Sequence, residues 1–133
     1  MKRLGVLAAV TYLLAACGQA GSAGKITVTM DEWSIKLSET SAPAGDVSFV
    51  LKNNGKVTHE LAILKTDLAP DRLAYRANDP SKAEEPGNVG EIEDVAPGAS
   101  KEGTFKLTPG KYVLVCNEPE HYKAGMRIAL VVK

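Results

Sequence analysis

Alternating apolar and polar positions recur along most of the chain after Lys25, and they predict a series of short β-strands. The alternation is clear at residues 25–30, 33–37 and 111–117, and further strand-like runs occur at 47–52, 59–65, 100–107 and 126–133. In the second of these runs Trp33, Ile35 and Leu37 fall on one face. Turn-forming residues occupy 41–46, 53–55 and 108–110, the last with the composition of a hairpin turn. The series predicts an all-β sandwich or barrel whose strands pair antiparallel and bury one face.

Residues 66–99 are less regular and predict an excursion over the sheet edge. Residues 68–77 favour a short helix, with Asp67 as a candidate cap and Pro70 in the first turn. Residues 78–88 are polar and rich in turn formers, which is typical of a solvated connector. We see no internal repeat, so the excursion is interpreted as part of one domain.

The N-terminal segment predicts a leader followed by an anchor. Residues 1–3 are basic and residues 4–16 are apolar, too short a run to span a bilayer as a helix. Residues 14–17, Leu-Ala-Ala-Cys, resemble the lipobox of bacterial lipoproteins, which implies that Cys17 is acylated after cleavage. The alternative is an ordinary secretory signal with a chance cysteine. The predicted units are a signal peptide (1–16), the lipidated Cys17 with a flexible tether (17–24), and one domain (25–133).

Charge and cysteine content narrow the class of protein. Removing residues 1–16 takes away Lys2 and Arg3, leaving 14 basic against 16 acidic residues and a net charge of −2. This balance gives no reason to expect nucleic-acid binding. If Cys17 is used by the anchor, Cys116 is the one remaining cysteine and no disulfide forms. We expect an extracytoplasmic monomer that is held on a membrane by lipid and does not span it.

The most informative chemistry lies near the C-terminus. Cys116, His121 and Met126 follow one another with four residues between each pair, and His59, the other of two histidines, begins the strand predicted at 59–65. A thiolate, two imidazoles and a weak thioether are the ligand set of a blue-copper electron-transfer site. Each residue alone is better explained as core or loop, but all four fall where such a site needs them. The site is predicted to be formed by a tight loop between two strands.

Residues 53–60 and 110–126 resemble the cupredoxins, especially the small sulfocyanin, plastocyanin and azurin types. The resemblance implies a Greek-key β-sandwich or barrel with one type 1 copper. His59, Cys116 and His121 would be the equatorial ligands and Met126 the axial one. Two departures stand out: Glu60 replaces an asparagine usual in plastocyanins and azurins, and Glu120 replaces a glycine usual in sulfocyanin-like loops. Glu60, Asn117, Pro119 and Tyr122 are expected either to support the ligands from behind or to contact a docking partner.

The resemblance implies a one-electron carrier rather than an enzyme, with electrons passing through the exposed edge of His121. Its partner would be a redox protein such as a cytochrome or a copper/haem oxidase. A copper-delivery or storage protein without redox turnover is the main alternative, and a module that has lost its metal is a third. A thiol-protease pair of Cys116 and His121 lacks a third orienting group. A loose set of carboxylates is either a solvated surface, which we favour, or a rim that steers a basic partner: Glu84, Glu85, Glu91, Glu93, Asp94.

Overall fold

The computed structural model describes residues 24–133. The predicted signal peptide, Cys17 and most of the tether lie outside the described residues. Between Gly24 and Lys133, no helix has the length and apolar character needed to cross a membrane.

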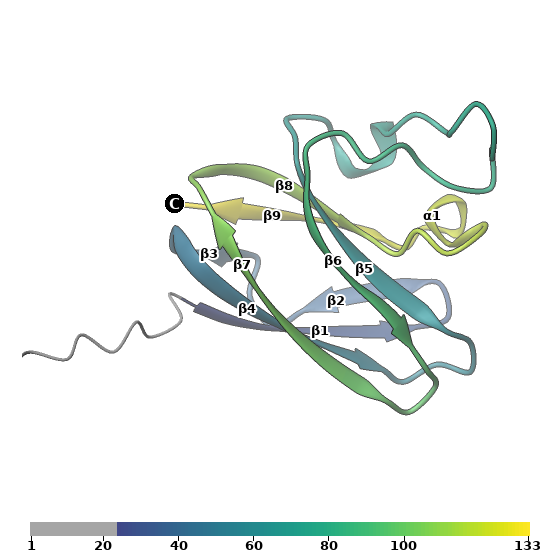
Figure 1. The fold of residues 1–133 in the computed structure, drawn as a ribbon, viewed down its shortest axis with the longest axis horizontal. Coiled ribbons are helices and arrows are strands. Elements are labelled where there is room, and N and C mark those ends of the chain that lie inside the picture. The colour runs from purple at the N-terminus through teal and green to yellow at the C-terminus, as the bar shows by residue number, and fades with distance from the viewer. Residues whose placement is uncertain (1–23) are drawn as a thin grey trace, which may run out of the picture.

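Two β-sheets pack face to face (Figure 1). The first has the strand order β2-β1-β4-β7 and is made of Ser34–Leu37, Gly24–Asp31, Gly45–Asn53 and Ser100–Leu107. The second has the order β3-β9-β8-β5-β6 and is made of Ser41–Ala42, Arg127–Val132, Gly110–Val115, His59–Lys65 and Asn88–Val95. The predicted all-β sandwich is confirmed. The expectation of antiparallel pairing throughout is wrong, because β1 runs parallel to β4 and β3 parallel to β9.

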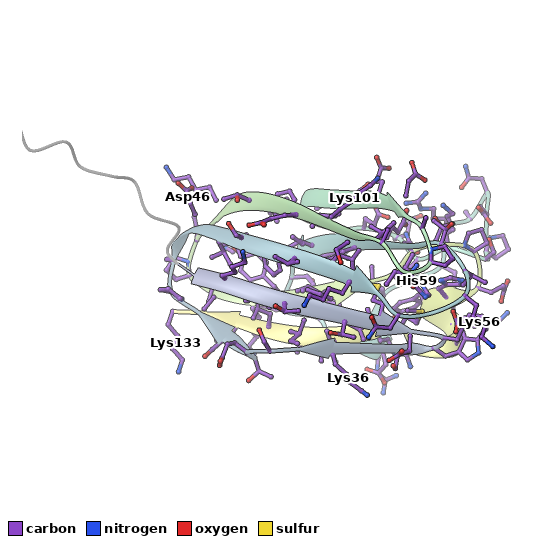
Figure 2. All side chains as sticks on the ribbon, turned by 90° about the horizontal axis from the view of Figure 1, so that it is seen from below. Lys36, Asp46, Lys56, His59, Lys101 and Lys133 are labelled. Atoms are coloured by element: carbon purple, nitrogen blue, oxygen red, sulfur yellow. The ribbon has the colours of Figure 1, made fainter. Side chains whose placement is uncertain are left out.

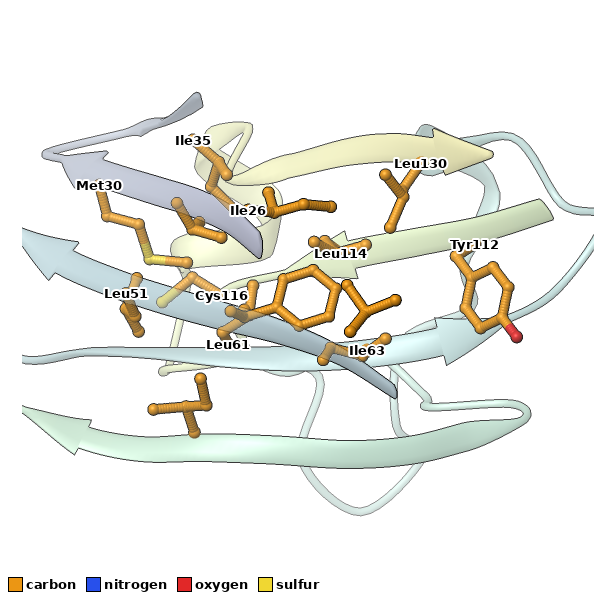
Figure 3. Packing of buried hydrophobic residues seen from close by; sticks show 14 of the residues in the cluster. Ile26, Met30, Ile35, Leu51, Leu61, Ile63, Tyr112, Leu114, Cys116 and Leu130 are labelled. Atoms are coloured by element: carbon orange, nitrogen blue, oxygen red, sulfur yellow. The ribbon is translucent and has the colours of Figure 1, made fainter. Parts of the chain in front are cut away.

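The main core lies between the two sheets and follows from the alternation of side chains along each strand. From the first sheet, Ile26, Met30 and Leu51 point inward, and Leu61 and Leu114 meet them from the second (Figure 3). Cys116 belongs to the same cluster, so the sulfur that the sequence singles out is built into the wall of the core.

The second sheet is covered on its outer face as well. Ala62 and Leu64 of β5 and Val113 and Val115 of β8 point away from the main core and form a second buried cluster with residues of the excursion and the last loop: Leu73, Ala83, Tyr122. Burial on both faces explains why β5 and β8 read as almost continuous apolar runs. These two strands are the ones that lead to His59 and Cys116.

The excursion, which we define as residues 66–87, differs from the prediction. In place of a helix over 68–77 it contains a single 3-10 turn, η1 (Pro70–Arg72), whose N-cap is Ala69 rather than Asp67. Beyond η1 the chain makes a turn at residues 77–82 that is closed by the antiparallel bridge between Tyr75 and Ala83, and the Glu84 amide donates to the carbonyl of Ala74. Asn88–Val95, in the part of the less regular stretch for which no element was predicted, form the edge strand β6.

Three turns also differ from their sequence-based interpretation. Trp33 does not share the inward face of Ile35; it lies in the β1–β2 turn with a φ of 70° and is 51% exposed. Residues 108–110 join strands of opposite sheets rather than a hairpin, and the Tyr112 hydroxyl fixes this corner by bonding the amide and carbonyl of Thr108. The short strand β3 lies within the turn predicted at 41–46.

The sandwich has two distinct ends. Gly24 pairs with Val47, next to Asp46, and Asp46 and Lys133 mark one end of the molecule in Figure 2. His59 lies toward the other end. From Gly24, β1 runs to the end where β5 begins and where the last loop returns the chain into β9 (Figure 1).

Candidate metal centre

His59 is placed by the turn that precedes β5. The Asn53 side chain donates to the carbonyls of Val57, at 2.7 Å, and Val95, at 2.8 Å, and it accepts from the Gly55 amide at 2.8 Å. These bonds satisfy a fully buried amide group and fix the backbone that enters β5. His59 is the first residue of that strand, and its side chain is completely buried.

The ligand loop, residues 116–126, closes on itself through its backbone. Cys116 follows β8 directly, and its amide donates to the carbonyl of Met126 at 3.0 Å. The Met126 amide donates to the carbonyl of His121 at 3.1 Å. Between them lies α1 (His121–Ala124), one helical turn that ends at Gly125 with a φ of 113°, a conformation that glycine adopts without strain. The loop therefore brings its cysteine, histidine and methionine to one end of the sandwich.

Three donor atoms converge in the interior. The Cys116 Sγ lies 3.6 Å from His59 Nδ1 and 3.2 Å from His121 Nδ1, and the two Nδ1 atoms are 3.3 Å apart. Ligands bonded at about 2.0–2.3 Å to one first-row metal ion and spread in a plane lie about 3.5 Å from one another. The observed triangle matches this spacing, so the residues fit a trigonal metal site. Met126 is fully buried and belongs to the same core cluster as Cys116.

Burial sets the protonation of the metal-free site. It lowers the pKa of both His59 and His121, so both imidazoles are neutral and have a lone pair for a metal. It raises the pKa of the Cys116 thiol to about 11. A metal ion must therefore displace the thiol proton when it binds, since the thiolate is the ligand.

Glu60 and Asn117 stabilise the site in different ways. The Glu60 backbone amide donates to Cys116 Sγ at 3.4 Å, while burial raises the pKa of its carboxyl to about 7. Asn117 is buried and pairs with both backbone groups of Ala83, accepting at 2.7 Å and donating at 2.9 Å. It also donates to Glu85, which is paired with Arg76 at 2.8 Å. The ligand loop is thus fastened to the excursion.

Pro119 and Tyr122, the other two residues with an expected docking or supporting role, differ in their exposure to solvent. Pro119 is exposed on the ligand loop. Tyr122 is 1% exposed, and its hydroxyl accepts from the Leu73 amide at 3.0 Å and donates to the Pro70 carbonyl at 2.9 Å. The buried Tyr122 side chain can therefore support the ligand loop from the interior, but it cannot contact a docking partner.

The outer edge of the centre is formed by a residue that the sequence did not single out for this role. Trp33 lies edge-on to His121, with ring centroids 5.2 Å apart, and His121 is only 7% exposed. Asn53 and Glu32 were missed as well. Asn53 carried a signal, since it stands in an Asn-Asn-Gly turn just before a ligand. Glu32 carried none, because its contacts are made with residues 24 or more positions away.

Comparison with known proteins agrees with this geometry. The family model of the cupredoxin-like domain matches residues 4–129. Reduced auracyanin from Roseiflexus castenholzii is 23% identical, with a TM-score of 0.63 over 86% of this chain and 99% of that chain. Rusticyanin from Thiobacillus ferrooxidans is 18% identical, with a TM-score of 0.65 over 85% and 79%. The azurin Az-iso2 from Methylomonas sp. strain J is 16% identical, with a TM-score of 0.58 over 84% and 99%.

At such identities the solved structures establish the fold alone, and no curated protein matches the chain. The family match spans nearly the whole sequence, and the three buried donor residues form a group that could hold one metal ion. The chain belongs to the cupredoxin-like family, and His59, Cys116 and His121 with Met126 form its type 1 copper site.

Proposed function

We propose that this protein is a one-electron carrier and not an enzyme. The observation that carries the proposal is a set of three donor atoms from His59, Cys116 and His121, all buried and all within 4.8 Å of one another. Bound copper supplies a one-electron couple between Cu(II) and Cu(I). The thiolate favours the reduced ion and the imidazoles hold either, so a fixed arrangement of both suits either charge state.

The protein contributes rigidity and exclusion of water. His59 is fixed by the turn braced by Asn53, and the ligand loop is fixed by backbone bonds and by its attachment to the excursion. Side chains held in this way do not need to rearrange when an electron arrives or leaves. Burial also lowers the local dielectric, which strengthens the effect of each hydrogen bond around the sulfur.

A copper-delivery or storage function is the second candidate, because the same ligands could serve it. A delivery site should be open and exchange its metal readily. Here His59 and Cys116 are completely buried, and Trp33 lies over the edge of His121. This closure favours the carrier. Slow exchange of copper together with reversible redox cycling supports the carrier, and fast transfer to a metal-free acceptor supports delivery.

For location and partner, we propose the extracytoplasmic face of a membrane, with Cys17 acylated, and a redox protein such as a cytochrome or a copper/haem oxidase. The leader and the lipobox-like segment support the location. Exposed acidic side chains near the excursion, including Glu84 and Glu91, could steer a basic partner, whereas Glu85 is already paired with Arg76. The salt dependence of the electron-transfer rate tests this steering.

Optical and EPR spectra of the Cu(II)-loaded protein test the function. We expect an intense visible thiolate-to-copper band and a narrow hyperfine splitting, both removed by ascorbate. Cys116→Ser abolishes the band because the thiolate ligand is lost. Cys17→Ser, the matched control, keeps the band while releasing the protein from the membrane fraction. A pale spectrum of tetragonal copper in the unmodified protein contradicts the carrier and favours delivery.

A further inference from the structure

One nitrogen of a copper ligand has no hydrogen-bond partner. Among residues 24–133, His59 Nε2 is the single buried side-chain nitrogen or oxygen without one. The other ring nitrogen, Nδ1, faces Cys116 and His121. When Nδ1 binds the metal, the ring proton must be carried by Nε2, so this atom becomes a buried donor. Ligand histidines almost always donate this second N–H to a carboxylate, a carbonyl or water.

A carboxylate stands opposite this nitrogen. Glu32 Oε1 lies 3.8 Å from His59 Nε2, and the Glu32 side chain is 30% exposed where the histidine is completely buried. Glu32 comes directly after β1, whereas His59 begins β5 in the opposite sheet. The contact therefore joins the two sheets at the copper end of the sandwich.

The position of this carboxylate is built into the turn before β5. The backbone amides of Lys56 and Val57 both donate to Glu32 Oε1. A Cβ atom at Gly55 would overlap the carboxylate, so the glycine leaves the space that Glu32 fills. The amide bonds, that of Lys56 first, lower the pKa of Glu32 and keep it an anion. Residues 53–57 thus form a cradle for a negative charge beside a metal ligand.

We propose that Glu32 is a positioning residue of the copper centre: its carboxylate holds the His59 ring proton on Nε2 and stabilises Cu(II) relative to Cu(I). The separation of 3.8 Å is longer than a hydrogen bond of about 2.7–3.2 Å, so the contact is one of charge with a ring N–H dipole. A fixed negative charge favours the more positive ion. The effect on reduction potential rests on the proposed redox function, whereas the effect on copper affinity does not.

Glu32→Gln tests the proposal because it keeps the shape and removes the charge. We expect binding of Cu(II) to weaken about 10–100-fold, the usual cost of losing an outer-sphere partner, and binding of Cu(I) to change less. Each tenfold change in the ratio of the two affinities raises the reduction potential by about 59 mV. Competition with chelators measures both affinities, and a redox titration measures the potential.

Gly55→Ala is a second, independent variant, since it displaces the carboxylate without changing its charge. It should shift the affinities and the potential in the same direction as Glu32→Gln. Glu39→Gln, at an exposed position between β2 and β3, controls for net charge and should change neither. Asp31→Asn controls for through-space electrostatics, because Asp31 adjoins Glu32 and acts on His59 by charge alone.

The ring ¹⁵N shifts of His59 in the diamagnetic Cu(I) protein give a direct readout of which nitrogen is protonated. We expect Nε2 to be protonated in the unmodified protein and its signal to shift in Glu32→Gln and Gly55→Ala. The proposal is overturned if Glu32→Gln behaves like Glu39→Gln, or if Asp31→Asn has as large an effect. If the unmodified protein binds copper tightly but is not reversibly oxidised and reduced, the electron-carrier function is contradicted. The comparison of copper affinities between the variants would still test the role of Glu32.

Discussion

The Cys116 sulfur receives a hydrogen bond from the Glu60 backbone amide. Every residue except proline would supply that backbone donor at position 60, so the sulfur keeps its hydrogen bond although glutamate stands where plastocyanins and azurins usually have asparagine. The side-chain bracing expected from an asparagine after the first histidine comes here from Asn53 and Asn117. The departure at Glu60 therefore changes the charge near the site more than its geometry.

Met126→Leu should raise the reduction potential, because a weak thioether donor to Cu(II) is replaced by a hydrocarbon of similar volume. Redox titration of the blue band measures the change. Met30→Leu is the matched control, since Met30 is also fully buried in the main core. The reduction potential of this variant should equal that of the unmodified protein. A potential that falls or does not move in Met126→Leu would remove Met126 as the axial ligand.

At the scale of elements, the excursion and the ligand loop act as one unit. Tyr122 of α1 inserts into the second cluster beside Leu73 and Ala83, and its hydroxyl satisfies two backbone groups of the excursion. The Glu120 amide adds a bond to the Ser81 carbonyl at 2.8 Å. The excursion, part of which the sequence suggested to be a solvated connector, therefore packs against the ligand loop and stabilises it.

Tyr122→Phe should lower the free energy of unfolding of the metal-free protein by about 1–3 kcal/mol, because it leaves the buried Leu73 amide without an acceptor. Urea denaturation measures this loss. Tyr75→Phe removes a hydroxyl from a half-exposed ring that packs edge-on against Tyr122, and it should change stability by less than about 0.5 kcal/mol. Equal stability of both variants would show that the hydroxyl bonds do not anchor the excursion.

The bounds of several strands were predictable from the residue pattern and the turn residues around them, whereas elements that depend on contacts with distant segments were not. β5 and β7 have the bounds that the pattern predicts. β6 was missed because it is an edge strand with two register shifts, and only Ile92 and Val95 along it are buried. The predicted helix at 68–77 does not form because its backbone bonds Tyr122 and the chain around Ala83 instead.

Across the whole molecule, the copper site draws on distant parts of the sequence. The cysteine, the second histidine and the methionine could be predicted as ligands because they share one short loop. His59 could be predicted as the remaining ligand because it is the only other histidine of the sequence. The roles of Glu32 and Trp33 could not, because both lie in the β1–β2 turn and reach the centre only when the sheets pack. Sequence patterns report local periodicity, and these contacts are not local.

Because the site needs the folded chain, copper should stabilise the whole domain. We expect a gain of about 4 kcal/mol in free energy of unfolding when free copper exceeds its dissociation constant a thousandfold, less any binding to the unfolded chain. Copper displaces the proton of the Cys116 thiol, whose pKa burial raises to about 11, so the gain decreases steadily as pH falls. Burial lowers the pKa of His59 and His121, so the additional loss caused by protonation of the rings begins only below the ordinary histidine pKa of 6.5.

Chemical denaturation with and without copper, from pH 8 to pH 4, measures this stabilisation. Removal of the metal with a chelator should reverse it, and Cys116→Ser should show little of it at any pH. A gain that is independent of pH, or that survives in Cys116→Ser, would place the copper elsewhere on the protein.

β1 carries the chain along the sandwich from one end to the other, over eight residues or about 26 Å at 3.3 Å per residue. It begins at the end that holds Lys133 and finishes one residue before Glu32, beside His59 (Figure 2). An attachment point ahead of Gly24 is therefore separated from the copper ligands by the length of the domain. A protein held to a lipid surface through Cys17 would be attached at the end of the domain away from Trp33 and His121. The copper end would then stay accessible to redox partners in the aqueous phase, while the predicted flexible tether lets the domain reorient.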